Sequence, residues 1–208
     1  DIMTNGKAIF GCGVGYRDIE FKAFGTSRTQ RGKRFEENLT AIKRLWTEET
    51  VTMKGSHFEL DEASCSAKPV QQPHPPIWIG ATADAAIQRA ARMGTCWYSG
   101  PSDRLDIVAG QVDTYKRALD GEDKPFPDEF PVRREVFVAR TREEAFRVAG
   151  EPIMNKYKAY HAWGLGSSRA GKTEELAQSF EDMARDRFLI GSVDDVAEQI
   201  IKFNKRVG

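Results

Sequence analysis

The stretch KPVQQPHPPIWIGATADAAIQRAARMG (residues 68–94) contains a complete strand, turn and helix. Its prolines keep the approach extended and supply no ladder donors, so the strand is expected to begin at Ile77. Gly80 and Ala81 then make a turn of small residues, and Thr82 is a suitable N-cap for the Ala-rich helix that follows. The stretch therefore predicts one β-loop-α unit.

The turn from Gly80 to Ala83 is also a candidate anion site. Small side chains at Gly80, Ala81 and Ala83 would let an anion approach backbone N–H groups at the positive end of the following helix. A phosphate group fits this description. The alternative is that Gly80 and Ala81 only make a tight connection between the strand and the helix.

Composition limits the classes of function. The 208 residues are 40% hydrophobic and carry 31 acidic and 31 basic side chains, which is typical of a soluble globular protein with one or two domains. A net charge of zero disfavours binding to nucleic acid or an anionic membrane, and no apolar run reaches the ~20 residues of a membrane span. The 3 cysteines lack CxxC spacing and the 3 histidines share no ligand spacing, so we expect no metal site and a reducing, cytoplasmic setting.

Strands alternate with helices along the chain. Such alternation, with apolar strands, indicates a parallel sheet covered by helices, either doubly wound or a (β/α)-barrel. Four strands are counted, too few for an eight-stranded barrel, which takes ~250 residues. Besides the strand at Ile77, the sequence predicts strands over 7–13, 95–99 and 131–139, a helix over 31–47, a hairpin over 51–60 and a long loop over 14–29.

A helix over 102–119 would be capped by Ser102 and carry an apolar stripe of Leu105, Val108, Val112, Tyr115 and Leu119. Thr141 and Glu144 form a capping box for a helix from 141, and a separate helical segment is expected beyond Pro152. Ser192 is expected to cap the last helix, with Val193, Val196, Ile200 and Phe203 facing inward.

Two charged residues share one face of the strand predicted over 131–139. Arg133 and Glu135 lie on that face, and Val132, Val136 and Val138 lie on the other. In a barrel the charged face would be the interior, where charges are costly unless they pair or serve a ligand. Both are therefore candidate catalytic residues, and a pair between them is the alternative.

Two glycine-rich segments suggest phosphate binding less strongly. Residues 166–173 (GSSRAGKT) match the P-loop pattern, but a polar, helical segment precedes them, which predicts a mobile surface connection. Gly11, Gly13 and Gly15 lack the spacing of a dinucleotide fingerprint. Alternating glycines at a strand end do allow the backbone to approach a flat ring system; the alternative is a strained turn.

Several motifs occur together in a fixed order. They are GxGxGY at 11–16, EFxxFG at 20–25, RxxRxxE at 31–37, PHPPIWIG at 73–80 and AAxxGxxW at 90–97. In this order, and over nearly the whole chain, they resemble the bacterial luciferase-like family of flavin-dependent monooxygenases and oxidoreductases.

The resemblance implies an α/β fold of the TIM (β/α)8-barrel type. The chain would form a single domain over 1–208, incomplete at both ends, with about strands four to seven and their helices. It also implies FMN, or alternatively the deazaflavin coenzyme F-420, as cofactor. The cofactor-binding residues would be Gly13, Gly15, Tyr16, Gly80, Ala81, Thr82, Ala83 and Trp97, with the phosphate at the Gly80 to Ala83 turn.

The chain departs from the family pattern at two places. Thr95 and Cys96 stand where the family usually has Asp-Gly, so the backbone beside the cofactor is expected to differ. Relatives that act on alkanesulfonates carry Arg and His two residues apart in the seventh strand. Here Arg133 and Glu135 occupy those positions, and Glu135 replaces the His. The catalytic chemistry of those relatives therefore cannot be assigned in full to this chain.

The resemblance implies a flavin-dependent oxidoreductase, with a monooxygenase using reduced FMN and O₂ on a small organic substrate as the main hypothesis. Deazaflavin-dependent hydride transfer and a non-catalytic interaction module are the alternatives, and a homodimer is expected. Four strands alone would expose apolar faces at Phe10, Ile77, Ile79 and Trp97. We therefore expect further chain or a second copy to cover them.

Overall fold

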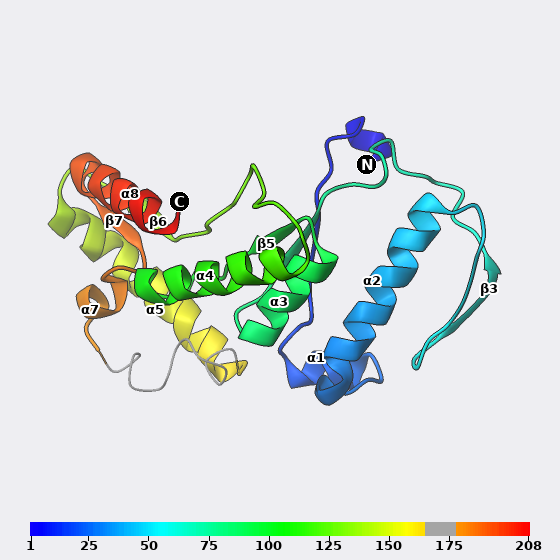
Figure 1. Cartoon of the computed structure of the whole chain (residues 1–208). Helices are drawn as coiled ribbons and strands as arrows, with labels where there is room; N and C mark the ends of the chain where they lie inside the picture. The colour runs from blue at the N-terminus through cyan, green and yellow to red at the C-terminus, as the bar shows by residue number, and fades with distance from the viewer. Residues whose placement is uncertain (165–177) are drawn as a thin grey trace.

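The computed structural model describes residues 1–164 and 178–208, so the P-loop-like segment 166–173 lies outside the described residues (Figure 1). The described elements, in chain order, are η1 (Ile2–Thr4), β1 (Phe10–Gly13), α1 (Asp18–Ala23), η2 (Arg28–Gln30), α2 (Arg31–Thr47), β2 (Val51–Lys54), β3 (Glu59–Ala63), β4 (Ile77–Gly80), α3 (Asp84–Met93), β5 (Cys96–Tyr98), α4 (Leu105–Gly121), β6 (Val136–Val138), α5 (Arg142–Ala162), α7 (Phe180–Ala184), β7 (Leu189–Gly191) and α8 (Val193–Val207).

The strands that follow the predicted alternation are parallel. β4 lies between β1 and β5 in one sheet, and β6 pairs with β7 in a second. β7 was not predicted, so the four strands expected from the sequence are one fewer than the parallel strands among the described residues. With three residues, β7 is too short to give a periodic signal in the sequence. The predicted hairpin is confirmed as the antiparallel pair β2–β3.

The two faces of the β1–β4–β5 sheet differ in character. Ile77, Ile79 and Trp97 point to the helix-covered face and are 0%, 2% and 0% exposed. The chain itself covers these three residues, so the expectation that further chain or a second copy is needed to cover them is wrong. Phe10 also packs on that side, with its ring centroid 5.3 Å from that of Trp46. The face opposite, hereafter the open face, carries the alternate residues Gly11, Gly13, Trp78, Gly80 and Tyr98.

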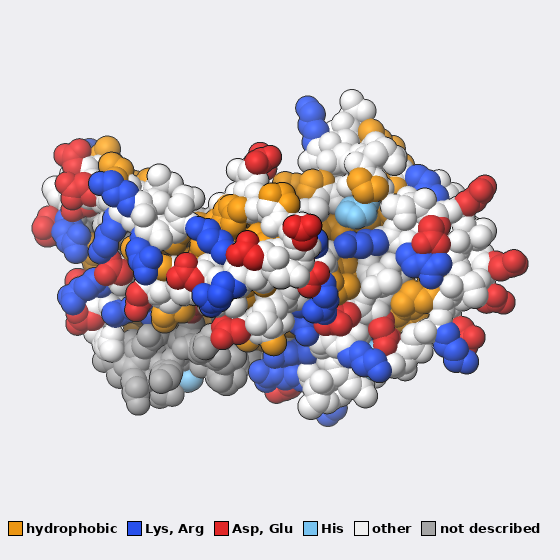
Figure 2. All heavy atoms as spheres, viewed as in Figure 1, with side chains coloured by type: hydrophobic (Ala, Val, Ile, Leu, Met, Phe, Trp, Pro, Cys, Tyr) orange, Lys and Arg blue, Asp and Glu red, His pale blue; other side chains and the backbone are white. Residues whose placement is uncertain are grey.

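Helices α3 and α4 lie side by side and cover the buried face of the sheet (Figure 1). The predicted stripe on α4 is confirmed, since all its members are buried: Leu105, Val108, Val112, Tyr115 and Leu119. Burial of each large apolar side chain stabilises the fold by roughly 1.5–3 kcal/mol. Charged side chains of both signs are interspersed over the surface of the face seen in Figure 2.

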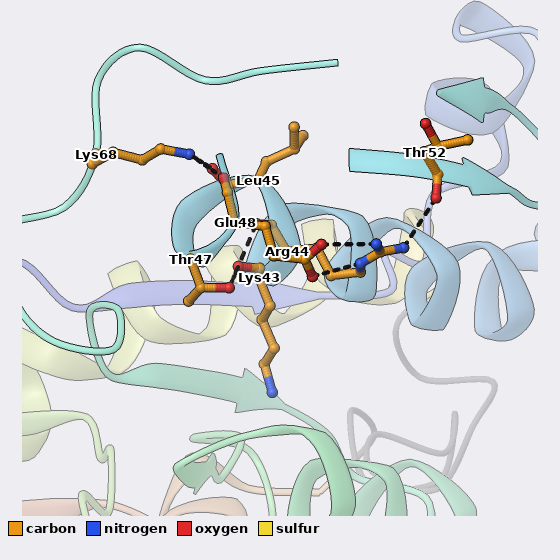
Figure 3. A network of polar contacts seen from close by, with 7 residues as sticks. All are labelled: Lys43, Arg44, Leu45, Thr47, Glu48, Thr52 and Lys68. Carbon is orange, nitrogen blue, oxygen red and sulfur yellow. Dashed lines mark hydrogen bonds and ion pairs between the residues drawn. The ribbon is translucent and has the colours of Figure 1, made fainter. Parts of the chain in front are cut away.

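The C-terminal end of α2 is tied to two later segments (Figure 3). Arg44 forms a bidentate ion pair with Glu48, with N···O distances of 2.7 and 2.8 Å, and also donates to the Thr52 carbonyl of β2 at 3.3 Å. Lys68 Nζ donates to the Leu45 carbonyl at 2.7 Å. The hydrogen bond from Arg44 lowers the pKa of Glu48. These contacts position the Pro-rich approach to β4.

The predicted starts of two helices need correction. Thr82 is not the N-cap of α3, because the cap position is Ala83, which makes no side-chain cap bond. Ser102 does not cap α4 either, since that helix begins after Arg104. The Thr141 cap is confirmed, because its side chain accepts from the Glu144 N–H.

Four longer segments also differ from prediction. The loop expected over 14–29 contains helix α1, and the strand expected over 131–139 is restricted to β6. Helix α5 continues through Pro152, which was expected to separate two segments. On α8 the structure buries Val196 and Phe203 as predicted but leaves Val193 and Ile200 exposed. These two therefore do not face inward as expected.

Gly94 gives a test of the contact between α3 and β4. A Cβ at this position would lie 2.9 Å from the Ala90 oxygen and 3.1 Å from the Ile77 oxygen, although its φ of −95° suits any residue. Because backbone atoms cannot yield easily, Gly94→Ala should lower the free energy of unfolding by about 2 kcal/mol, measured by urea denaturation.

Gly110→Ala is the matched control, because a Cβ there meets nothing within 4 Å. In the interior of α4 this change should raise stability by about 0.5–1 kcal/mol. Equal effects of the two substitutions would show that close packing at Gly94 is not what requires glycine.

Candidate cofactor site

The parallel strands β1, β4 and β5 bring three small-residue loops to one edge of the sheet. They follow Gly13, Gly80 and Tyr98, and Gly13 and Gly80 are register partners. A Cβ on Gly13 would lie 3.7 Å from the Gly80 oxygen, and one on Gly100 would lie 3.3 Å from Thr82 Cγ2. The loops therefore meet without large side chains between them, as ligand sites at the carboxyl ends of parallel strands require.

The loop after β4 is held from the buried side. Trp97 Nε1 donates to the Ala81 carbonyl at 2.9 Å, and Gln111 Nε2 donates to the Thr82 carbonyl at 3.0 Å. The Ala81 N–H bonds to the Tyr98 oxygen at 3.4 Å. Helix α3 begins directly after this loop, so the loop lies at the positive end of the helix dipole.

Trp97 serves this loop from the core. Its ring lies on the helix-covered face, among Tyr115 and Phe130, with ring centroids 5.7 and 5.6 Å away. The side chain is 0% exposed, and its indole N–H holds the Ala81 carbonyl. Its predicted direct contact with the cofactor stays a prediction.

Gly13 and Gly15 line a hollow of about 260 Å³ between the β1 loop, α1 and α2. Gly15 has a φ of +74°, and its carbonyl accepts a hydrogen bond from Arg31 Nη1 at 2.9 Å. The left-handed conformation explains the need for glycine there. The predicted ring-approach role of these glycines stays a proposal.

Tyr16 and Arg17 continue this loop towards α5. The Arg17 guanidinium lies 4.5 Å from the Trp163 ring centroid at the end of that helix. Burial raises the pKa of Tyr16, and the nearby Tyr160 contributes in the same direction. The chain segment after β1 is thus brought beside α5, which the sequence separates from it by more than a hundred residues.

The structure separates the two charged candidates, Arg133 and Glu135. The Arg133 guanidinium lies 5.3 Å from the Tyr98 ring centroid, beside the open face. Glu135 instead accepts hydrogen bonds from Lys156 Nζ and, at 3.5 Å, from the Tyr157 hydroxyl. Burial, and then the Glu135 charge, raise the pKa of Tyr157. The partner of Glu135 is therefore a lysine of α5.

Comparison with known proteins identifies the fold and its family. The family model for luciferase-like monooxygenases matches residues 1–208. This chain belongs to the luciferase-like monooxygenase family.

Relatives of known function support this assignment. An FMNH₂-dependent dimethylsulfone monooxygenase from Pseudomonas putida is 29% identical over 97% of this chain and 59% of its own length. The chain thus spans about three-fifths of that relative.

Solved structures share the fold. The oxygenating constituent of 3,6-diketocamphane monooxygenase from Pseudomonas putida, in complex with FMN, superposes with a TM-score of 0.79 at 20% identity, over 100% of this chain and 63% of that one. An F420-dependent secondary alcohol dehydrogenase superposes with a TM-score of 0.72 at 16% identity, over 98% and 62%. At these identities the likeness shows the fold alone.

One departure from the family pattern lies away from the candidate site. Thr95 precedes β5, and its hydroxyl and N–H bond to the Ile77 backbone at 2.9 to 3.0 Å. The Cys96 thiol is buried, and this burial raises its pKa to about 11. Both residues lie at the start of β5, whereas the loops that form the candidate site lie at strand ends.

Three polar residues of the site were not predicted: the buried Asp103 and Gln111, and the half-buried Arg134. Arg134 Nη1 donates to the Gly100 oxygen at 3.0 Å, and burial lowers the pKa of its guanidinium to about 10. One signal was present in the sequence, because Gln111 lies three residues after Val108 and four before Tyr115. That spacing puts an amide on the buried face of α4.

Other classes of site find no support in the part of the chain that the structure covers. Within residues 1–164 and 178–208, no three His, Cys, Asp or Glu side chains form a group that could hold a metal ion. Across the same residues, no helix is both long and apolar enough to cross a membrane.

The pair between Glu135 and Lys156 can be tested by a double-mutant cycle. The side chains are 24% and 34% exposed, so their interaction is partly shielded from water. We expect Glu135→Gln and Lys156→Met to show a coupling energy of about 1 kcal/mol in urea denaturation.

The control cycle uses Lys54 and Glu59, which lie 3.9 Å apart and are 81% and 67% exposed. Its coupling should be close to zero, because exposed pairs are screened by water. If the Glu135 and Lys156 cycle gives no coupling energy, Glu135 is again a candidate catalytic residue.

Proposed function

We propose that this chain carries the cofactor site of a flavin-dependent monooxygenase that uses reduced FMN and O₂ to oxygenate a small organic substrate. Family membership supports the reaction class, and the FMNH₂-dependent relative supports the cofactor. The observation that carries the proposal is the loop after β4, whose two consecutive carbonyls are bonded to buried side chains at the start of a helix.

The residues fit an FMN phosphate at the Gly80 to Ala83 loop. Their side chains are small, and helix α3 contributes N–H groups and partial positive charge at the same place. The Asp84 carboxylate is the one acidic side chain in the first turn, and it lines surface hollows between α3 and α4. Because a carboxylate repels a phosphate, we assign the phosphate to the loop amides and not to the surface beside Asp84.

The flavin ring system fits the open face. Gly11 and Gly13 have no side chains to obstruct a flat ring, while Trp78 and Tyr98 stack at a centroid distance of 6.0 Å beside them. We propose that the ring lies near these glycines and that Gly15 and Tyr16 form its rim. When bound and reduced, the flavin would supply the two electrons that O₂ needs for insertion of one oxygen atom.

The protein's own contribution is binding, orientation and charge. Arg133 presents a guanidinium beside Tyr98, and we propose that it attracts an electron-rich or anionic part of the substrate. Glu135 is paired with Lys156, and we assign it a structural role instead of a catalytic one. A substrate small enough for a site of this kind, such as a dialkyl sulfone, is the first candidate because the relative acts on dimethylsulfone.

The activity test uses the purified protein that carries this chain. Reduced FMN and dimethylsulfone are supplied, and substrate loss is followed in air and under anaerobic conditions. We expect loss that requires both reduced FMN and O₂. Turnover with reduced deazaflavin but not with reduced FMN would replace this proposal by hydride transfer, and failure to bind either flavin would favour the non-catalytic alternative.

The phosphate assignment is tested by Ala81→Glu. A carboxylate in the loop would repel the phosphate and fill its space, so the Kd for FMN should rise more than about tenfold in fluorescence titration. Gln88→Glu adds the same charge on the exposed side of α3 and should leave the Kd unchanged. Equal affinities of the two variants would contradict the assignment.

A further inference from the structure

We infer that Trp97 and Gln111 are positioning residues that aim the N–H groups of Thr82 and Ala83 at the cofactor phosphate. The inference rests on the proposed function and extends it to side chains that do not touch the ligand. Both residues act through the backbone of one loop, and both do so from the buried face of the sheet.

The argument begins with two neighbouring carbonyls. The Ala81 oxygen accepts from Trp97 Nε1 at 2.9 Å, and the Thr82 oxygen accepts from Gln111 Nε2 at 3.0 Å. Trp97 belongs to β5 and Gln111 to α4, so two separate elements fix two consecutive peptide units. Loops with one such contact can still rotate about the neighbouring bonds, but this loop is held at both.

Peptide geometry converts these contacts into a direction for the donors. In a planar trans peptide the C=O of one residue and the N–H of the next point in opposite directions. When the Ala81 carbonyl points to the core, the Thr82 N–H must point away from it. The Thr82 carbonyl sets the Ala83 N–H in the same way, so both donors are turned away from the side chains that hold the loop.

These donors adjoin the start of helix α3, which begins at Asp84. Two outward N–H groups at the positive end of this helix make a concave arrangement of the kind that binds phosphate oxygens. Because the arrangement exists before the ligand binds, its ordering cost is already met in folding.

Gln111 is itself held in one orientation. Its Nε2 also donates to Asp103 Oδ2 at 3.1 Å, and Gln111 and Asp103 are only 3% and 1% exposed. Both neighbours of Nε2 are oxygen acceptors, so the amide nitrogen and not the amide oxygen must occupy this position. The Gln111 Oε1 atom is buried without a hydrogen-bond partner among the described residues. A buried amide with one unsatisfied atom is costly, which suggests that it is retained for the loop.

The experiment compares flavin binding by Gln111→Met, Trp97→Phe and a control. Gln111→Met keeps the approximate size of the side chain and Trp97→Phe keeps an aromatic ring but is smaller, and each removes the N–H that holds the loop. The control is Gln199→Met, because Gln199 makes two comparable bonds to the Ile190 backbone of β7, at 2.9 and 3.1 Å. For each purified protein the Kd values for FMN and for riboflavin are measured, together with the melting temperature.

The ratio of the two Kd values reports on the phosphate alone, because riboflavin lacks it. We expect each test variant to weaken FMN binding about tenfold and riboflavin binding little, whereas Gln199→Met should leave the ratio at its wild-type value even if its melting temperature falls equally. A general loss of folding would change both ligands together.

Two outcomes would overturn the inference, and they are distinguishable. If wild-type protein prefers FMN and both test variants keep that preference, the positioning role is wrong and the proposed function stands. If wild-type protein binds neither flavin, or binds riboflavin as tightly as FMN, the phosphate site itself is wrong and the inference falls with it.

Discussion

The parallel pairing of β4 with a strand on each side is the constraint on which the rest of the structure depends. Its backbone bonds to β1 and to β5, so the loops that follow all three strands must emerge at one edge of the sheet. The same pairing fixes the register of the side chains. Ile77 and Ile79 join the core under α3 and α4, while Trp78 and Gly80 take the opposite face. A slip by one residue would exchange core and open face, so fold and site are specified by the same hydrogen bonds.

The buried face does more than stabilise the sheet. Trp97 and Tyr115 fill the space between β5 and α4, and in the same layer Trp97 and Gln111 carry the donors that hold the loop after β4. Core packing thereby limits the motion of backbone atoms at the proposed phosphate site. This is the usual way in which a rigid scaffold prepares a ligand-binding loop, because the ordering cost is met when the protein folds.

The second pair of strands explains the roles of the charged candidates. β6 is hydrogen-bonded to β7 and not to β5 in the described part of the chain, and Arg134 lies where the two sheets approach. Its guanidinium bonds to the Gly100 carbonyl and lies 4.8 Å from the Phe203 ring centroid, joining the loop after β5 to α8. Arg133, which directly precedes it in the chain, lies beside Tyr98. One residue therefore connects the sheets, and its neighbour faces the proposed substrate.

The sequence by itself determined the elements with a clear period or punctuation, because these depend on local chemistry. The prolines before Ile77 and the small residues from Gly80 to Ala83 predicted the central unit and its candidate anion site, and the apolar spacing predicted the buried stripe of α4. Tertiary structure decided what local chemistry leaves open. It showed which face of β5 carries Trp97, that Glu135 meets Lys156, and that Gln111 reaches Thr82 from α4. These outcomes depend on which distant segments pack together, and a short strand such as β7 gains its ladder only from that packing.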